Sequence, residues 1–269
     1  MKIPGKKLVP YWLGMKLRGV WQKFLAMQYS GSEYHCPYCG NSFRKFLPGG
    51  SDFSILIEKQ MVGAGYRDNM LCPRCFSVDR DRLIYLYLKE KTNIFTAPLK
   101  VLHIAPEGCL RALLMSLPNI QYKSGVKYFD GQYYYDRKVN LMDVSDMPFE
   151  DGSFDVVICN HVLEHIENDA KAVSEIYRVL LPGAWAILQV PISRILQTTF
   201  HDPNAITPKQ REEVYGQFDH VRIYGQDYPD FLNKHGFMVK KFNPFQDGFH
   251  EDLKKYALNP EESLFVAFK

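Results

Sequence analysis

The sequence predicts an α/β fold in which a largely parallel sheet is covered by helices on both faces. Between residues 98 and 269, short apolar runs alternate with stretches of helical periodicity. The runs lie at 101–104, 154–159 and 184–190, and the helical stretches lie at 109–117 and from Asp169 onward. This alternation is typical of strands joined by crossover helices. Ligands of such sheets bind beyond the carboxyl ends of the strands, so functional residues are expected there.

Composition and length exclude several classes of protein. The chain has 269 residues, of which 46% are hydrophobic and 23% charged, so it is neither disordered nor collagen-like. It has no apolar run long enough to span a membrane. Lys16 and Arg18 interrupt the apolar part of the N-terminal region, and no small-residue cleavage site follows, so secretion is not expected. The sequence therefore predicts a cytoplasmic protein.

Residues 1–32 form a basic segment with a predicted amphipathic helix at 11–28. They contain six Lys and Arg residues and no acid, so the net charge of +3 leaves −3 on the other 237 residues. Apolar residues recur at helical spacing, namely Leu13, Leu17, Val20, Trp21 and Phe24. One interpretation is that this apolar face packs on the body of the protein. The alternatives are peripheral contact at the inner membrane face and contact with nucleic acid.

Residues 33–76 carry two Cys-x-x-Cys pairs and are predicted to form a zinc-ribbon-like module. The pairs are Cys36 with Cys39 and Cys72 with Cys75. Two such turns supply the four thiolates of a structural zinc site and leave no open coordination position. The 32 residues between Cys39 and Cys72 exceed the usual spacing of a compact site, so a hairpin insert is expected there. Gly40 suits the tight turn after the first pair.

The other predicted elements follow in order along the chain. Residues 77–97 are expected to form a helical connector, and strands are expected near 120–126 and 139–142. Asp169 is the expected N-cap of a helix that Pro182-Gly183 stops. The positions just after the predicted strands, where ligand contacts are expected, are 105–108, 143 and 160–165.

Residues 98–190 resemble the class I S-adenosylmethionine-dependent methyltransferases of the type 11 group. The resemblance rests on Asp143, the run 148–155, the His-Val-Leu-Glu-His run 161–165, the run 175–180 and Pro182-Gly183. It implies a Rossmann-like seven-stranded sheet, formed by a domain at 98–269, whose last strand is antiparallel. The run 263–268 matches that last strand, and 236–239 matches the start of the strand before it in sequence.

The resemblance also implies a site for S-adenosyl-L-methionine, although two of its motifs differ from the family pattern. His103 stands where most members have an acid, and Ala105 and Glu107 stand where they have glycines. This Leu-His-Ile-Ala-Pro-Glu form resembles a subset of the family that carries a four-cysteine module. The strand near 120–126 lacks its ribose-binding acid, and Asp130 is the next carboxylate. The implied cofactor-binding residues are His103, Ala105, Pro106, Glu107, Gly108, Asp130, Asp143, Val144, Asn160 and His161. Within this set, Glu107 is expected to face the cofactor's ammonium group.

Candidate catalytic residues lie in two regions. His161 and His165 follow the apolar run 154–159, and a structural role for His165 is an open alternative. The second region is 216–225, where Asp219 and His220 are expected to form an oriented base and Arg222 to receive an anionic group. A salt bridge within the loop is the alternative interpretation of this region.

The sequence leaves three functions open. The first is methyl transfer to a small-molecule, saccharide or lipid-linked acceptor, with the basic helix docked on a membrane. The second is methylation of ribosomal RNA or tRNA, with the zinc module as the recognition element. The charge of −3 on residues 33–269 disfavours it. The third is a non-catalytic interaction protein on a degenerate cofactor fold, which the altered first loop favours and the 143–183 block opposes.

Overall fold

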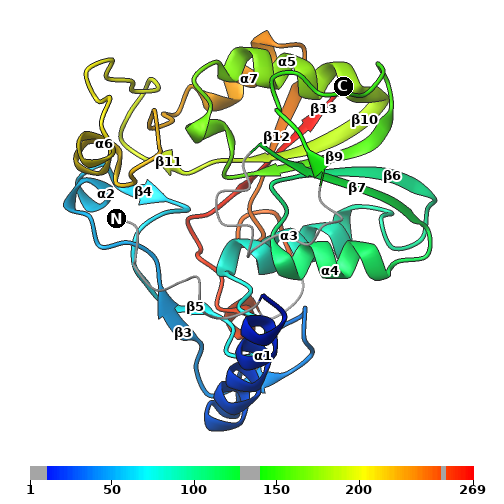
Figure 1. Cartoon of the computed structure of the whole chain (residues 1–269), viewed down its shortest axis with the longest axis vertical. Coiled ribbons are helices and arrows are strands. Elements are labelled where there is room, and N and C mark those ends of the chain that lie inside the picture. Colours follow the sequence, from blue (N-terminus) through cyan, green and yellow to red (C-terminus); the bar gives the residue numbers. More distant parts are fainter. Residues whose placement is uncertain (1–10, 128–139, 250–252) are drawn as a thin grey trace.

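The computed structural model describes residues 11–127, 140–249 and 253–269, and Figure 1 shows the course of the chain. Lys2, Lys6, Lys7 and the expected ribose-binding Asp130 lie outside these described residues, as does the side chain of Leu13. None of the helices within these ranges combines the length and the hydropathy that a membrane-spanning segment requires.

The centre of the fold is a seven-stranded sheet with the strand order β12-β13-β10-β9-β6-β7-β8. Its strands are β6 (Leu99–Ile104), β7 (Ile120–Val126), β8 (Asn140–Leu141), β9 (Phe154–Asn160), β10 (Leu180–Gln189), β12 (Met238–Phe242) and β13 (Leu264–Phe268). β13 runs antiparallel to both of its neighbours, whereas the other adjacent strands are parallel. The expected Rossmann-like sheet with an antiparallel last strand is therefore confirmed.

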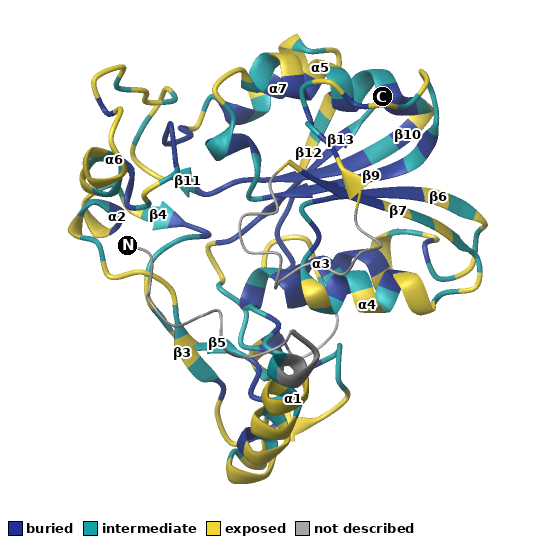
Figure 2. Ribbon diagram, in the orientation of Figure 1, coloured by how far each residue is buried: buried dark blue, intermediate teal, exposed yellow. Residues whose placement is uncertain are grey.

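Both faces of the sheet are covered by helices, which explains the continuous apolar runs in its strands. The helices are α3 (Asp79–Lys91) and α4 (Gly108–Ser116) on one face and α5 (Asp169–Val179) and α7 (Tyr228–Lys234) on the other. Val156, Val157 and Ile158 of β9 are fully buried between these two layers, and Figure 2 shows the buried strands. α3 lies within the predicted helical connector 77–97, and its buried side chains pack on the sheet.

Two local expectations around α5 are corrected by the structure. The N-cap is Asn168, whose side chain accepts a hydrogen bond from the Lys171 backbone N–H, so Asp169 is the first helical residue. The helix ends at Val179, before Pro182-Gly183, because the chain turns directly into β10. Pro182-Gly183 lies in that strand, where its pairing with β9 shifts register between Leu180 and Trp185.

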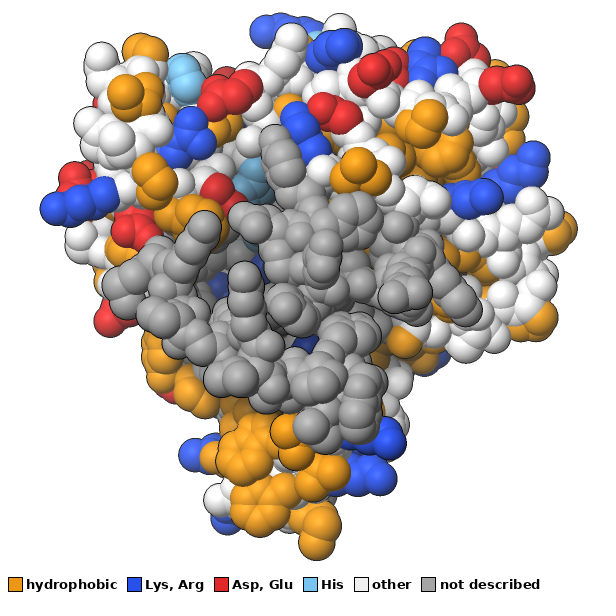
Figure 3. Space-filling view, viewed as in Figure 1, with side chains coloured by type: hydrophobic (Ala, Val, Ile, Leu, Met, Phe, Trp, Pro, Cys, Tyr) orange, Lys and Arg blue, Asp and Glu red, His pale blue; other side chains and the backbone are white. Residues whose placement is uncertain are grey.

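The predicted N-terminal helix is present as α1 (Tyr11–Gln28), but most of its described apolar side chains face solvent. Leu17, Val20, Trp21, Phe24 and Met27 are between 53% and 78% exposed, and Figure 3 shows hydrophobic side chains gathered at this end of the molecule. Leu25 is buried, and its neighbour Ala26 packs against the cysteine module. The interpretation that the apolar face packs on the protein body is therefore wrong for these side chains.

The cysteine module contains two short antiparallel pairs. β1 (Ser30–His35) pairs with β2 (Ser42–Phe43), and β3 (Leu47–Gly49) pairs with β5 (Arg67–Leu71). The β3–β5 pair is the expected hairpin-like insert, but residues 50–66 extend far beyond it. They contain α2 (Ser54–Glu58) and β4 (Met61–Val62). We call residues 50–66 the crossing segment.

The crossing segment joins the cysteine module to the sheet domain. β4 pairs antiparallel with β11 (Ile192–Ser193), a short strand that follows β10 in the sequence. α2 contacts α6 (Pro208–Tyr215), which belongs to the region between β10 and β12 (Figure 1). The segment therefore lies over the carboxyl ends of β9 and β10, where a ligand of such a sheet is expected.

Candidate functional site

The four paired cysteines come together in one cluster. All four sulfur atoms lie within 4.8 Å of one another, and none forms a disulfide. The distance from Cys36 Sγ to Cys75 Sγ is 3.5 Å, and that from Cys39 Sγ to Cys72 Sγ is 3.7 Å. In a tetrahedral zinc site with Zn–S bonds of about 2.3 Å, the sulfur atoms lie about 3.8 Å apart. The donor set and its spacing therefore fit a zinc ion.

The two cysteine turns have the same backbone geometry. Gly40 N–H donates to the Cys36 carbonyl and Phe76 N–H donates to the Cys72 carbonyl, each at 2.9 Å. Gly40 and Phe76 both adopt the left-handed conformation, with φ of 69° and 59°. A phenylalanine is strained in this conformation, which glycine adopts freely. Closing the second turn therefore imposes a strain that the first turn avoids.

The loop after β6 is organised by His103. This ring is fully buried, and its Nε2 lies 2.7 Å from Glu107 Oε2 while its Nδ1 lies 3.1 Å from the Tyr122 hydroxyl. Burial raises the pKa of Glu107, whereas the bond to His103 lowers it. The lowering is the larger effect, so the pKa of Glu107 lies below its usual value. Ala105 has a φ of 48°, and its N–H donates to the Gly125 carbonyl. His103 thus positions Glu107. Of the neighbouring residues, Pro106 is buried, and Gly108 is exposed at the start of α4.

Asp143 and Val144 lie just after β8. Asp143 Oδ2 is 2.8 Å from Lys127 Nζ, and Asp143 Oδ1 accepts a hydrogen bond from the Ser145 N–H. Burial raises the pKa of Asp143, but the bond to Lys127 and the Ser145 N–H lower it to a net value below its usual range. Val144 is buried. Lys127 follows β7, so a cation stands near the place where the resemblance implies an acid.

Several buried polar atoms at the carboxyl end of β9 have no hydrogen-bond partner among the described residues. They are both amide atoms of Asn160, Nε2 of His161, both carboxylate oxygens of Glu164 and Nε of Arg80. His161 has a φ of 52°, and its N–H donates to the Gln189 carbonyl at 2.7 Å. Buried polar groups without partners are rare in folded proteins, and strained residues cluster at functional sites. This end of β9 is therefore a candidate ligand-binding site.

The expected Asp219–His220 pair is not formed. Asp219 Oδ2 lies 3.3 Å from His165 Nδ1, whereas His220 Nε2 faces Glu164 Oε1 at 3.9 Å. Burial lowers the pKa of His165, but Asp219 raises it to a net value above its usual range. Burial raises the pKa of Asp219, but His165 lowers it to about 2. Burial lowers the pKa of His220 to about 4. The fold thus brings together His165, Asp219 and His220, which the sequence placed in two candidate regions, and it pairs Asp219 with His165.

Arg222 does not point into an open site. It forms an ion pair with Asp169, and its Nη2 donates to the Glu167 carbonyl at 2.9 Å. It is only 7% exposed. The alternative interpretation of Arg222 as a salt-bridge residue therefore describes the structure, because Asp169 already neutralises the guanidinium that was expected to receive an anion.

A cavity of about 300 Å³ lies between the crossing segment and the carboxyl end of β9. Residues of the sheet domain that line it include His161, Glu164, His165 and His220. The other side includes Gly63, Ala64, Gly65 and Arg67 from the cysteine module, together with Arg80 from α3. The sequence did not indicate that the module contributes a wall of this cavity. The Gly-Ala-Gly run at 63–65 was the available signal of a close backbone approach.

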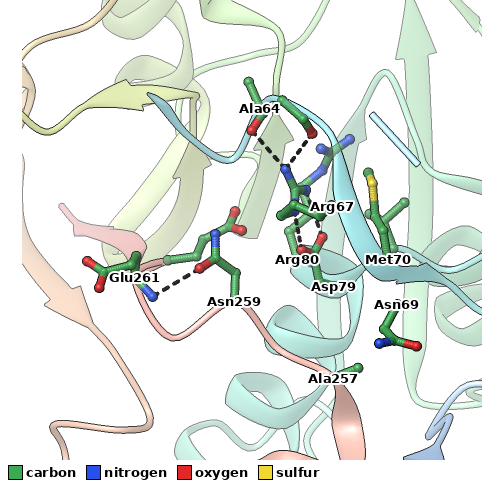
Figure 4. A network of polar contacts seen from close by, with 12 residues as sticks. Ala64, Arg67, Asn69, Met70, Asp79, Arg80, Ala257, Asn259 and Glu261 are labelled. Carbon is green, nitrogen blue, oxygen red and sulfur yellow. Dashed lines mark hydrogen bonds and ion pairs between the residues drawn. The ribbon is translucent and has the colours of Figure 1, made fainter. Parts of the chain in front are cut away.

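Arg67 fixes this wall in place (Figure 4). Its Nη1 donates to the carbonyls of Ala64 and Gly65 at 2.8 and 3.0 Å, and its Nε and Nη2 donate to both carboxylate oxygens of Asp79 at 2.7 and 3.0 Å. Such a bidentate pair is geometrically specific as well as strong. Gly63 approaches closely, since a Cβ there would lie 3.4 Å from Glu262 Oε1 and from the His161 ring. The wall is therefore held rigidly against the strand end.

One stretch of the chain matches a known protein family. Residues 122–188, which begin in β7 and end in β10, match the family model described as "Methyltransferase domain". This match supports a methyltransferase. The matched stretch includes Asp143, Asn160 and the 161–165 run, and it begins after the loop at 103–108, where the sequence departs from the family pattern.

Curated relatives match over short regions. The chain is 35% identical over 71 residues to the ajmaline N-methyltransferase of Rauvolfia serpentina, which is 26% of this chain and 23% of that protein. It is 39% identical over 54 residues to an uncharacterized 37.1 kDa protein in transposon TN4556 of Streptomyces fradiae, which is 20% of this chain and 16% of that protein. The matches thus span less than a quarter of either relative's length.

The chain is also similar to solved structures. The crystal structure of a SAM dependent methyltransferase from Archaeoglobus fulgidus is 16% identical to this chain, with a TM-score of 0.46. The comparison covers 70% of this chain and 93% of the other.

Proposed function

We propose that the protein is an S-adenosylmethionine-dependent methyltransferase that acts on a small hydroxyl-bearing acceptor. The observation that carries this proposal is the set of unpartnered atoms at the carboxyl end of β9, namely both amide atoms of Asn160 and Nε2 of His161. They lie inside the stretch that matches a methyltransferase domain. Buried groups of this kind are normally satisfied by a ligand or ordered water. The seven-stranded sheet order supports the same function.

The cofactor residues divide by the part of S-adenosylmethionine that they would hold. Glu107 carries the carboxylate for the ammonium group, and His103 fixes its position. Asp143 and Val144 would hold the adenosine part, and Asn160 and His161 the methionine part. When bound, this cofactor supplies a methyl group on a positively charged sulfur. A structural zinc ion, held by the cysteine cluster, would fix the module that walls the acceptor cavity.

The protein's own contribution to the reaction is mainly positioning. Aligning two bound reactants lowers a barrier by about 7–11 kcal/mol through effective concentration. The crossing segment forms one side of the cavity. His161 Nδ1 lies 3.3 Å from Glu164 Oε1, which leaves Nε2 as the atom in position to accept a proton from a hydroxyl acceptor. Arg80 Nε, also unpartnered in the described structure, would face an oxygen atom of the acceptor.

The acceptor is proposed to be small because the cavity is small and because residues 33–269 carry a net charge of −3, which disfavours a nucleic acid. A cavity of about 300 Å³ suits a small molecule or the reactive end of a saccharide or lipid-linked acceptor. RNA remains the alternative acceptor, and its binding would weaken steeply with salt. Binding of a ribosomal RNA fragment at low salt, at affinities that exceed those for small acceptors, would favour that alternative.

Titration calorimetry with S-adenosylmethionine tests the cofactor site. We expect the full chain to bind it with a Kd below roughly 100 μM. Asp143→Asn and Glu107→Gln should each weaken binding about 10- to 100-fold, because hydrogen bonds to charged groups contribute about 1.5–3 kcal/mol. Asp151→Asn is the matched control. Asp151 precedes β9, its side chain is 83% exposed, and it pairs with Arg178. An absence of binding, or equal affinities in all variants, would contradict the proposal.

We further propose that α1 docks on an anionic membrane surface. Its exposed apolar side chains, including Trp21 and Phe24 with ring centroids 5.6 Å apart, lie on a segment with six basic residues and no acid. An apolar helix face flanked by cations is complementary to anionic lipid headgroups over acyl chains. Docking there would bring the cavity near lipid-linked acceptors.

Vesicle sedimentation tests this docking. We expect the full chain to pellet with phosphatidylglycerol-containing vesicles, and the double change Trp21→Glu with Phe24→Glu to weaken binding at least tenfold, because it places two charges in the apolar face. Ile206→Glu is the matched control, since Ile206 is 73% exposed but lies outside α1. Equal pelleting of all three proteins would contradict membrane docking. Loss of binding in the Ile206 variant alone would place the contact elsewhere.

A further inference from the structure

Three metal-ligating side chains meet on the sheet-domain side of the cavity, apart from the cysteine cluster. Glu164, His165 and His220 each offer one ligand atom, and these atoms lie within 4.8 Å of one another. Glu164 and His165 belong to the short 3₁₀ helix Leu163–His165 that follows β9, and His220 lies in the region before α7. All three line the cavity. The fold therefore gathers two imidazoles and one carboxylate from segments more than 50 residues apart.

Glu164 is the strongest sign that this cluster binds something. It is only 1% exposed, and neither of its carboxylate oxygens has a hydrogen-bond partner among the described residues. The nearest imidazole atoms are His161 Nδ1 at 3.3 Å and His220 Nε2 at 3.9 Å from Oε1. A buried carboxylate is costly unless it is hydrogen-bonded, paired with a cation or coordinated to a metal. His161 Nδ1 is the nearest of these atoms to Oε1, and a metal ion would supply a partner for the other oxygen, Oε2.

The surroundings of the cluster are those of a metal site. His165 presents its Nδ1 to Asp219 Oδ2 at 3.3 Å, which leaves Nε2 for a ligand. A carboxylate behind the second ring nitrogen is the usual support of a metal-bound histidine. The Val221 N–H donates to the Glu164 carbonyl at 2.9 Å and so ties the two segments together. The His165 and His220 rings stand 82° apart with centroids 4.7 Å from each other.

We propose that Glu164, His165 and His220 bind a divalent first-row transition-metal ion in this cavity. Ligand atoms around such an ion lie about 2.9–3.4 Å apart for bonds of about 2.1 Å, so small side-chain rotations complete the site. Two imidazoles and one carboxylate leave open coordination positions. These positions face the cavity and take an oxygen atom of the acceptor, whose hydroxyl pKa the ion lowers. This last role rests on the proposed function, whereas the ion site itself does not.

Manganese(II) distinguishes this site from the cysteine cluster, because oxygen and nitrogen ligands suit it and thiolates do not. Mn²⁺ is titrated into the zinc-loaded full chain without S-adenosylmethionine, and the free-ion electron paramagnetic resonance signal is followed. We expect one bound Mn²⁺ per chain, with pulsed spectra that show coupling to histidine nitrogen. This readout uses the unmodified protein and therefore does not depend on the folding of any variant.

Variants then assign the ligands. Glu164→Gln and His220→Gln should each weaken Mn²⁺ binding at least about 100-fold, and Asp219→Asn about 10- to 100-fold as a change behind a ligand. His235→Gln is the matched histidine control, since His235 Nδ1 bonds to the Phe231 carbonyl at the end of α7. Circular dichroism and thermal unfolding without Mn²⁺ identify folded variants.

The outcomes separate this inference from the proposed function. An absence of Mn²⁺ binding, an absence of nitrogen coupling, or equal binding by a folded Glu164→Gln variant would overturn the metal site. If Mn²⁺ binds as expected but S-adenosylmethionine does not, the metal site stands and the proposed function fails. If the cofactor binds and Mn²⁺ does not, the cluster is a polar network and the proposed function stands.

Discussion

Cys72→Ser is expected to remove bound zinc from the protein and to unfold the cysteine module. Cys72 is fully buried, and its sulfur lies 3.7 Å from that of Cys39. Structural zinc sites contribute about 10–16 kcal/mol of apparent binding free energy, and most of it depends on a complete set of four ligands. We therefore expect zinc measured by plasma mass spectrometry after dialysis to fall from about one ion per chain to nearly none.

The same change should also disrupt the cavity at the carboxyl end of β9, because the cysteine module forms one of its walls. The crossing segment lies between the two cysteine turns in the sequence and supplies Gly63, Ala64 and Gly65 to the cavity. Loss of the module's fold removes that wall, so methyl transfer should fall with the zinc content. Cys109→Ser is the control, since Cys109 lies outside the cluster and donates a hydrogen bond to Asp81 that serine can also make. Zinc retained in Cys72→Ser, or absent from the unmodified chain, would contradict the predicted site.

Arg82→Met is expected to cause the largest loss of stability outside the zinc site. Arg82 is completely buried at the start of α3. It donates to four backbone carbonyls in three segments of the chain. They are Met70 at 3.1 Å, Ser77 at 2.8 Å, and the adjacent Tyr256 and Ala257 at 2.6 and 3.2 Å. Its guanidinium also lies 4.5 Å from the centre of the Phe46 ring. A single side chain thus joins the cysteine module, α3 and the C-terminal segment.

Removing this guanidinium leaves several buried carbonyls without a partner. Each buried polar group left unsatisfied costs about 1–3 kcal/mol, so the free energy of unfolding should fall by at least about 3 kcal/mol. Urea unfolding followed by circular dichroism measures this change. Arg82→Lys should also destabilise the protein, because an ammonium cannot reproduce the planar fork of donors. Arg44→Met, at an exposed arginine of the same module, should change stability by no more than about 0.5 kcal/mol. A similarly small effect of Arg82→Met would show that water replaces its contacts.

Local patterns in the sequence predicted most of the elements. The strand expected near 120–126 is β7, and the helix expected at 11–28 is α1 (Tyr11–Gln28). The cysteine cluster was also predictable, because each Cys-x-x-Cys turn places two thiolates together regardless of the rest of the fold. The errors were local as well, since Asn168 and Asp169 are both good N-caps and only the backbone shows which one is used.

The sequence indicated several of the polar residues that line the cavity, but not the contacts between them. His165 was expected after the run 154–159, and Asp219 and His220 were expected to pair within 216–225, yet Asp219 pairs with His165. Glu164 lies within the positions 160–165 where ligand contacts were expected, but no role was predicted for it. Arg222 was expected to bind an anion, but it forms an ion pair with Asp169, which lies 53 positions away in the sequence. Pairing between such distant side chains leaves no periodic signal in a single sequence.

By itself, the sequence determined the α/β class, the spacing of the paired cysteines, the basic charge of the first 32 residues and the strand ends that carry polar side chains. These properties depend on neighbours within a few turns or strand positions, where periodicity and spacing act directly. Only the tertiary structure decided that the crossing segment closes the cavity and that the apolar face of α1 remains exposed. It also decided that Glu164 meets two histidines. These arrangements depend on long-range contacts such as the β4–β11 pair, whose free energy arises from surfaces that meet only after the whole chain has folded.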